Sequence, residues 1–183
     1  MKIYADTGRI ILREIMPEDL AAMHELDSDP AVHRYLGGRP NKSLQETADN
    51  IAFIRQQYID NGIGRWAIMD KHSNEFMGWG GLKFITTPIN DHVNFYEVGY
   101  RLIRKYWGLG FATEAARASL KYAFEVLLLE NVYAMAHQEN SASIHTLQKS
   151  GLEITGQFEY QGLPCYWFEI DRNSWQLKSL AEG

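Results

Sequence analysis

Two glycines, Gly108 and Gly110, stand one residue apart where a predicted strand gives way to a predicted helix. The strand, residues 95–103, is rich in aromatic and branched side chains, and the helix, residues 111–126, repeats apolar side chains at helical spacing. Glycine lets the backbone turn tightly and approach a ligand, so the free N–H groups that begin the helix can point at an anion. The spacing predicts a phosphate site, with a plain strand-to-helix turn as the alternative.

Two common phosphate motifs do not fit this turn. A Walker loop needs a lysine and a hydroxyl residue after its last glycine, and here Phe111 follows Gly110. A dinucleotide fingerprint needs a third glycine where this chain has Thr113, and an acidic residue at the end of the next strand. Glu130 has roughly the right separation but precedes that strand. Nucleotide hydrolysis and nicotinamide or flavin binding are therefore disfavoured.

The rest of the chain must position this turn, and its patterning predicts a single α+β domain over residues 1–183. The expected strands are residues 9–14, 66–70, 76–84, 95–103, 131–136, 153–160 and 165–171. The expected helices are residues 17–26, 44–58, 111–126 and 143–149. Three consecutive strands joined by short links indicate an antiparallel meander. We therefore expect a mixed, mostly antiparallel central sheet flanked by helices.

Composition and charge narrow the function classes. The chain has 183 residues, of which 45% are hydrophobic and 22% are charged, which is typical of a globular protein and not of a disordered one. A net charge of −5 argues against broad nucleic-acid binding, which usually shows as a basic stripe. No window approaches the roughly 18 apolar residues of a membrane span, and no signal peptide is evident. We expect a soluble, cytoplasmic protein that binds neither nucleic acid nor membrane.

Cysteine and histidine give no sign of a metal centre. Cys165 is the one cysteine of the sequence, so an internal disulfide and a multi-cysteine metal site are excluded. None of the six histidines belongs to a His-x-x-x-His pair of the kind that binds zinc on a helix. No metal is expected.

A known family shares the glycine turn and a second polar cluster. The chain resembles the GNAT superfamily of acetyl-CoA-dependent N-acetyltransferases in residues 106–115, Tyr-Trp-Gly-Leu-Gly-Phe-Ala-Thr-Glu-Ala. Asn140, Ser143 and the Lys-Ser-Gly-Leu run at 149–152 stand at matching distances. The wording Trp-Gly-x-Gly-x-Ala-Thr-Glu-Ala and the Asn-x-x-Ser helix look like the Rim-type branch, which includes ribosomal-protein N-terminal acetyltransferases. The resemblance implies the acyl-CoA N-acyltransferase fold, with acetyl-CoA as donor co-substrate.

The resemblance also implies which residues hold that donor. The pyrophosphate of coenzyme A would rest on backbone N–H groups of Gly108, Leu109, Gly110, Phe111, Ala112, Thr113 and Glu114. The main chain of Arg101, Leu102 and Ile103 would pair with the pantetheine arm much as an added strand does. Asn140 matches the amide that contacts the same arm in the family, and the alternative is a loop asparagine that satisfies its own backbone.

Acetyl transfer to an amine needs a neutral attacking nitrogen and benefits from a donor to the departing thiolate. Glu97 is the candidate base because, counting by two along its strand, it shares a face with Gly99 and Arg101. The alternative is a surface carboxylate or one paired with Arg101. Many relatives place a tyrosine seven residues after the asparagine, where this chain has Leu147. Ser143 is the remaining candidate donor, although we favour Ser143 as the cap of its helix.

The acceptor is expected to be a primary amine that receives the acetyl group directly in a ternary complex. A covalent route through Cys165 is disfavoured, because that residue lies in an apolar strand with no histidine nearby in sequence. Loops at residues 32–41, 85–92 and 159–166 would choose among a protein N-terminus, a polyamine and an aminoglycoside. The resemblance favours a protein N-terminus and allows a homodimer. The alternative function is a non-catalytic module that binds or senses acyl-CoA.

Overall fold

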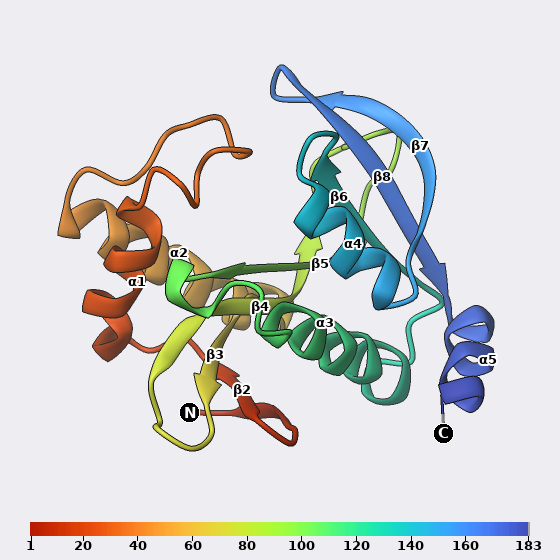
Figure 1. Cartoon of the computed structure of the whole chain (residues 1–183), viewed down its shortest axis with the longest axis horizontal. Coiled ribbons are helices and arrows are strands. Elements are labelled where there is room, and N and C mark those ends of the chain that lie inside the picture. The colour runs from red at the N-terminus through yellow and green to blue at the C-terminus, as the bar shows by residue number, and fades with distance from the viewer. Residues whose placement is uncertain (183) are drawn as a thin grey trace.

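A sheet of eight strands forms the centre of the molecule (Figure 1). The computed structural model describes residues 1–182. The strands are β1 (Ile3–Asp6), β2 (Ile10–Glu14), β3 (Trp66–Asp70), β4 (Phe76–Ile85), β5 (Phe95–Leu102), β6 (Asn131–His137), β7 (Glu153–Tyr160) and β8 (Leu163–Asp171). Their order across the sheet is β1-β2-β3-β4-β5-β6-β8-β7. All neighbours are antiparallel except β5 and β6, which are parallel, so the expected α+β class with a mixed, mostly antiparallel sheet is confirmed.

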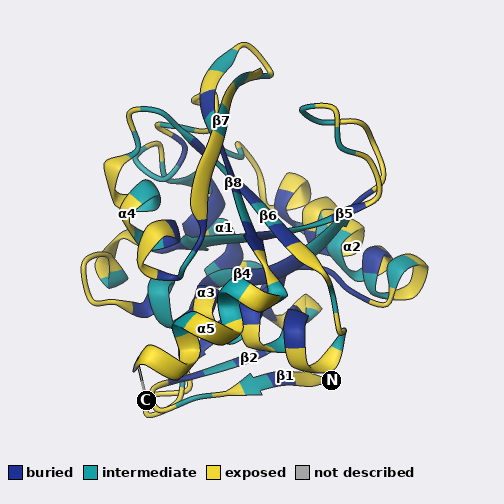
Figure 2. Ribbon diagram, turned by 90° about the vertical axis from the view of Figure 1, so that its right-hand side faces the viewer, coloured by how far each residue is buried: buried dark blue, intermediate teal, exposed yellow. Residues whose placement is uncertain are grey.

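Helices cover both faces of this sheet. They are α1 (Leu20–Ser28), α2 (Leu44–Asn61), α3 (Phe111–Lys121), α4 (Ser141–Lys149) and α5 (Arg172–Glu182). The apolar sides of α1 and α2 pack on one face, and those of α3 and α4 pack on the other, where Trp175 of α5 joins them. Figure 2 shows the buried strands between these layers, with β7 largely exposed at one edge of the sheet. Within residues 1–182 no helix is long and apolar enough to cross a membrane.

The sequence prediction missed an element near each end of the chain. Strand β1 has only four residues, and three of them are partly or fully exposed, so no alternating pattern predicts it. Helix α5 leaves Leu177 and Leu180 exposed and buries little beyond Trp175, so its apolar stripe is weak. The long helix expected to reach residue 126 ends at Lys121 and continues as one π-helical turn, Tyr122–Val126.

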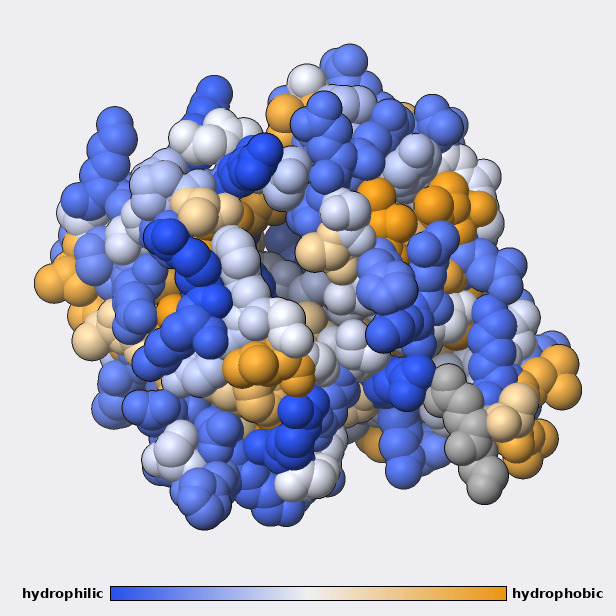
Figure 3. Space-filling model, in the orientation of Figure 1, coloured by the Kyte–Doolittle hydropathy of each residue, from blue (hydrophilic) through white to orange (hydrophobic). Residues whose placement is uncertain are grey.

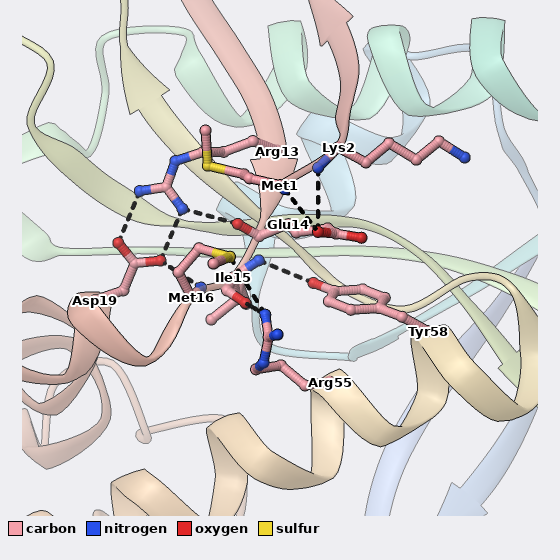
Figure 4. A network of polar contacts seen from close by, with 9 residues as sticks. All are labelled: Met1, Lys2, Arg13, Glu14, Ile15, Met16, Asp19, Arg55 and Tyr58. Atoms are coloured by element: carbon pink, nitrogen blue, oxygen red, sulfur yellow. Dashed lines mark hydrogen bonds and ion pairs between the residues drawn. The ribbon is translucent and has the colours of Figure 1, made fainter.

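Polar contacts fasten α1 and α2 to strand β2 (Figure 4). Arg13 forms a bidentate ion pair with Asp19, with N–O distances of 2.8 and 2.7 Å. Arg55 of α2 donates to the carbonyl oxygen of Ile15 at 2.9 Å, and the Tyr58 hydroxyl accepts the Ile15 N–H at 3.0 Å. These bonds satisfy the backbone where β2 leaves the sheet, and they hold both helices in place over strands β3 to β5.

Candidate active site

The turn between β5 and α3 adopts a backbone that favours glycine at two positions. Gly108 has φ +73° and Gly110 has φ +84°, in the left-handed region that L side chains rarely adopt. A Cβ on Gly108 would meet no atom within 4 Å, so the backbone angle and not crowding requires glycine there. Gly110 is the N-cap of α3, and the predicted glycine turn lies where the sequence placed it.

The N–H groups of this turn are open to a ligand. Within the described chain, the amide groups of residues 108–113 donate to no backbone or side-chain acceptor. The amide of Glu114, in contrast, donates to the Gly110 carbonyl at 3.1 Å. The predicted cradle therefore ends at Thr113, and the positive end of the α3 dipole adds to it. Backbone donors of this kind bind a phosphate or another anion.

Side chains from the distant β1–β2 turn hold the glycine turn in shape. The Glu114 carboxylate accepts from the Thr7 hydroxyl at 2.6 Å and pairs with the Arg9 guanidinium at 2.7 Å. Burial raises the pKa of Glu114, but the hydrogen bonds from Thr7 and Arg9 outweigh it and the pKa lies below its ordinary value. Arg9 also donates to the Leu109 carbonyl at 3.0 Å and covers the Phe111 ring at 4.5 Å. The Glu114 side chain is thus committed to the scaffold.

A groove of about 900 Å³ runs beside the turn, along the outer side of α3. Thr7 and Arg9 line it at one side, and Thr113, Arg117 and Lys149 line it along the helices. The groove gives room next to the open N–H groups for a larger chemical group attached to a bound phosphate.

Strands β5 and β6 separate immediately after they meet. Glu97 and Tyr133 form the one register pair between them, although each strand has at least seven residues. From Val98 to Leu102, β5 pairs with β4 on one side only. Figure 3 shows the face hollowed near its centre, above β5 in the view of Figure 1. The separation leaves a free strand edge next to the cradle, where an extended ligand can pair with the main chain.

Part of the predicted pantetheine contact on β5 is already occupied. The Ile103 N–H donates to the Met77 carbonyl at 2.9 Å, and its carbonyl accepts from the Tyr106 N–H at 2.9 Å. The Leu102 carbonyl accepts from the Trp107 indole at 2.8 Å. The sequence could not show these bonds, because they form only when the turn folds back on β5. The main chain between Val98 and Arg101 is therefore the part of β5 that is better placed to pair with a ligand.

Glu97 is paired with an arginine that the sequence did not suggest. Its carboxylate accepts from Arg65 at 2.6 Å, and the exposed fractions of the two side chains are 13% and 10%. Arg65 also donates to the main-chain oxygens of Gly81 and Glu97, at 2.8 and 3.0 Å. The guanidinium lies against Gly99, where a Cβ would come within 2.7 Å of it. The sequence alternative of a pair with Arg101 is wrong, and Glu97 is instead held rigidly where β5 leaves β6.

Arg101 binds a different carboxylate. Its guanidinium pairs with Asp27 of α1 at 2.9 Å, and Asp27 is almost fully buried. The guanidinium groups of Arg101 and Arg65 both lie over the Trp79 ring, at 4.9 and 5.2 Å. The Arg101 side chain therefore ties α1 to β5, and only its main chain is open to a ligand.

The second polar cluster lies at the start of α4. The Asn140 side chain accepts the Ser143 N–H at 3.2 Å, so Asn140 is the cap of this helix and the expectation that Ser143 caps it is wrong. The Tyr100 hydroxyl of β5 donates to the Ser143 carbonyl at 3.0 Å and lies 3.2 Å from the Ser143 hydroxyl. Burial raises the pKa of Tyr100 to about 12, so this hydroxyl stays protonated at neutral pH. Asparagine and serine both cap helices, so the sequence alone could not separate them.

Removing this cap has an expected cost in stability. Asn140→Ala should lower the free energy of unfolding by about 1 kcal/mol, because the Ser143 N–H loses its acceptor. Asn140→Asp keeps an acceptor oxygen and should stay close to the wild type. Urea unfolding of the three proteins measures the difference. An alanine variant as stable as the aspartate variant would contradict the capping role.

Comparison with known protein families adds an independent observation. The family described as "Acetyltransferase (GNAT) domain" matches residues 9–153. The chain belongs to the GNAT acetyltransferase family. The match spans β2 to the start of β7 and includes the glycine turn, Glu97 and Asn140. An acetyl-CoA-dependent acyltransferase is therefore the class of enzyme that this chain represents.

GNAT relatives agree with this assignment. "Uncharacterized N-acetyltransferase p20" of Bacillus licheniformis is 32% identical over 151 residues, which are 80% of this chain and 83% of the relative. A GNAT-family acetyltransferase structure from Bacillus anthracis superposes with a TM-score of 0.78 at 23% identity, covering 94% of this chain and 99% of that one. The Vibrio cholerae spermidine N-acetyltransferase in complex with CoA and spermine gives 0.74 at 20% identity, covering 93% and 99%. These two structures support the GNAT fold, while membership of the Rim-type branch stays a prediction.

Several residues of this GNAT site were missed from the sequence. Arg9 is 105 positions from Glu114, and Arg65 is 32 positions from Glu97, so no local spacing pairs them. Tyr100 could have been found, since it alternates with Glu97 and Arg101 and therefore faces α4 on the opposite side of the sheet.

Cys165 is buried on β8, and burial raises the pKa of its thiol. No cluster of three histidine, cysteine, aspartate or glutamate side chains suited to a metal ion occurs in residues 1–182.

Proposed function

We propose that this protein transfers the acetyl group of acetyl-CoA directly to a primary amine. The observation that carries the proposal is the run of open N–H groups at residues 108–113, next to the free edge of β5. The cradle suits a diphosphate, and an adjacent strand edge suits the amide-containing pantetheine arm. The amide of Asn140 is a further candidate contact to that arm. The presence of CoA in the related Vibrio cholerae structure supports the same choice of donor.

The candidate donor-binding groups and the candidate acceptor-binding groups lie on opposite faces of the sheet. The cradle and the Ser143 and Tyr100 hydroxyls belong to the face that α3 and α4 cover. Glu97 and Arg101 belong to the face that α1 and α2 cover, where their side chains meet Arg65 and Asp27. We infer that the donor binds from the α3 side and that the amine approaches from the α1 side. The reaction then takes place in the gap where β5 leaves β6.

The transfer needs three proton movements. The acceptor ammonium gives up one proton, and its nitrogen then attacks the thioester carbonyl carbon. The carbon–sulfur bond breaks, its electron pair leaves with sulfur, the nitrogen loses a second proton and the sulfur gains one. We propose Glu97 as base for the nitrogen, directly or through water. Ser143, whose hydroxyl lies beside that of Tyr100, is the candidate donor to sulfur.

Glu97→Gln tests the proposed base. We expect turnover to fall by about 100-fold at neutral pH, because an amine of pKa near 10 is almost wholly protonated there. The loss should shrink as the pH approaches the pKa of the amine, and acetyl-CoA affinity should not change. Glutamine can still accept from Arg65, which limits structural damage. Exposed Glu18→Gln is the matched control. A pH profile parallel to that of the wild type would remove Glu97 as base.

One assay tests the function itself. Thiol release from acetyl-CoA is measured over a panel of N-terminal peptides, polyamines and aminoglycosides, beside acetyl-CoA binding by calorimetry. We expect amine-dependent thiol release with at least one class. Tight binding with no thiol release on any amine would indicate a sensing module instead.

A further inference from the structure

On the face of the sheet that α1 and α2 cover, most charged side chains form ion pairs with one another. On this face of β4 and β5, Arg65 pairs with Glu97 and Arg101 pairs with Asp27. Arg65 has two further acceptors on the main chain. Each carboxylate therefore already has a guanidinium partner, and an additional cation would share that carboxylate with an arginine. The negative charge left over on this face for the several cations of a polyamine is therefore small.

Lys83 is a charged residue of this face that has no hydrogen-bond or ion-pair partner in the part of the chain that the structure describes. It stands on β4 directly across from Glu97 in the register of the sheet, and it is half-buried. Within residues 1–182 its ammonium forms no hydrogen bond and no ion pair, and it lies 5.8 Å from the centre of the Phe53 ring of α2. Burial and the nearby Arg65 guanidinium lower the pKa of Lys83, while Glu97 acts in the opposite sense.

A half-buried lysine without an ion-pair partner favours a negatively charged ligand. A partly buried ammonium is stabilised by an anion, and a charged hydrogen bond to a carboxylate replaces the water that it lost. A second cation at the same place would add repulsion from Lys83, Arg65 and Arg101. Directly opposed residues of antiparallel strands have Cβ atoms only about 5 Å apart. One small molecule can therefore reach Glu97 with an amine and Lys83 with an anionic group.

The loop after α1 limits the size of that molecule. Tyr35 of this loop packs its ring against His137, the last residue of β6, with ring centroids 5.4 Å apart. The loop thus joins the α1 side of the molecule to the far wall of the opening between β5 and β6. Figure 3 shows this opening as a hollow closed in on both sides. The enclosure favours a small acceptor over a folded protein.

We propose that the acceptor is a small amine that also carries a carboxylate, such as an amino acid, and that Lys83 binds the carboxylate. The proposal rests on the acetyltransferase function proposed above and names its substrate class.

The test compares each acid with its own amide. Thiol release is measured for the twenty amino acids, for their carboxamides, and for spermidine and an aminoglycoside. The proteins are the wild type, Lys83→Met, Lys83→Arg and the control Lys71→Met, which removes an exposed lysine from the β3–β4 turn. Because intrinsic amine reactivity is the same for every protein, the acid-to-amide ratio of kcat/KM isolates the carboxylate contact.

We expect at least one acid to exceed spermidine in kcat/KM. Its acid-to-amide ratio should fall about 10- to 100-fold in Lys83→Met, mainly through KM. Lys83→Arg should keep much of the ratio, and Lys71→Met should keep all of it. Turnover of the carboxamide shows that the Lys83→Met protein is folded.

Two results would overturn the proposal while leaving the transferase function intact. One is a polyamine or aminoglycoside that exceeds every acid, and the other is an acid-to-amide ratio unchanged in Lys83→Met. Failure of all amines to release thiol, with acetyl-CoA still bound, would instead refute the transferase function and this proposal with it.

Discussion

Gly110→Val should weaken acetyl-CoA binding by at least about 10-fold. A branched side chain at φ +84° costs on the order of 1–3 kcal/mol of backbone strain, and relief of that strain would turn the N–H groups of residues 108–113 away from the ligand. The new side chain would also press on Arg9, whose guanidinium would lie 3.3 Å from the added Cβ. Calorimetric titration with acetyl-CoA and with desulfo-CoA measures the loss without turnover.

Gly156→Val is the matched control for this substitution. Gly156 lies on the exposed strand β7, its φ is not positive, and an added Cβ meets no atom within 4 Å. We expect its acetyl-CoA affinity to equal that of the wild type. Equal affinities for Gly110→Val and Gly156→Val would show that the turn between β5 and α3 does not hold the donor.

Arg65→Met should lower the free energy of unfolding by about 3 kcal/mol. Breaking a buried ion pair from one side leaves the Glu97 carboxylate without its cation and two main-chain oxygens without their donor. Lys83, across the strand from Glu97, supplies a weaker substitute and keeps the loss at the low end of the range for such pairs. Urea unfolding measures the effect, with exposed Arg39→Met as control.

The double variant Arg65→Met with Glu97→Gln separates charge from packing. We expect it to be more stable than Arg65→Met alone, because no carboxylate remains unpaired. If the two single substitutions simply added, the ion pair would contribute nothing beyond the space that it fills. Turnover should be low in both proteins, since Arg65 positions the main chain and the side chain of Glu97.

The turn between β5 and α3 could be predicted because its causes are local. Gly108 and Gly110 are needed by their own backbone angles, and the apolar spacing after Phe111 defines α3 within the same stretch. The position of Asn140 at the start of a helix is local in the same way. Its role as helix cap could not be predicted in this way, because Ser143 three positions later is also a favoured N-cap residue.

The charges around Glu97 could not be predicted because they depend on register. Whether Glu97 meets Arg65 or Lys83 is decided by how β4 and β5 align and by which loop enters the space that Gly99 leaves open. A shift of one residue would exchange the two faces of the strand. Strand β1 was missed because its four residues are too few to show an alternating pattern, and it forms only by pairing with β2.

The contact between the β1–β2 turn and α3 affects when the phosphate cradle forms during synthesis and folding. Thr7 and Arg9 leave the ribosome well before their carboxylate partner Glu114, which follows 107 and 105 positions later. Contacts of such long range carry a large loop-closure entropy and form late in folding. The Leu109 carbonyl, which Arg9 binds, stays unanchored until then. A nascent chain that has completed the central strands would therefore still lack a fixed phosphate cradle, and affinity for the donor would be among the last properties that the protein acquires.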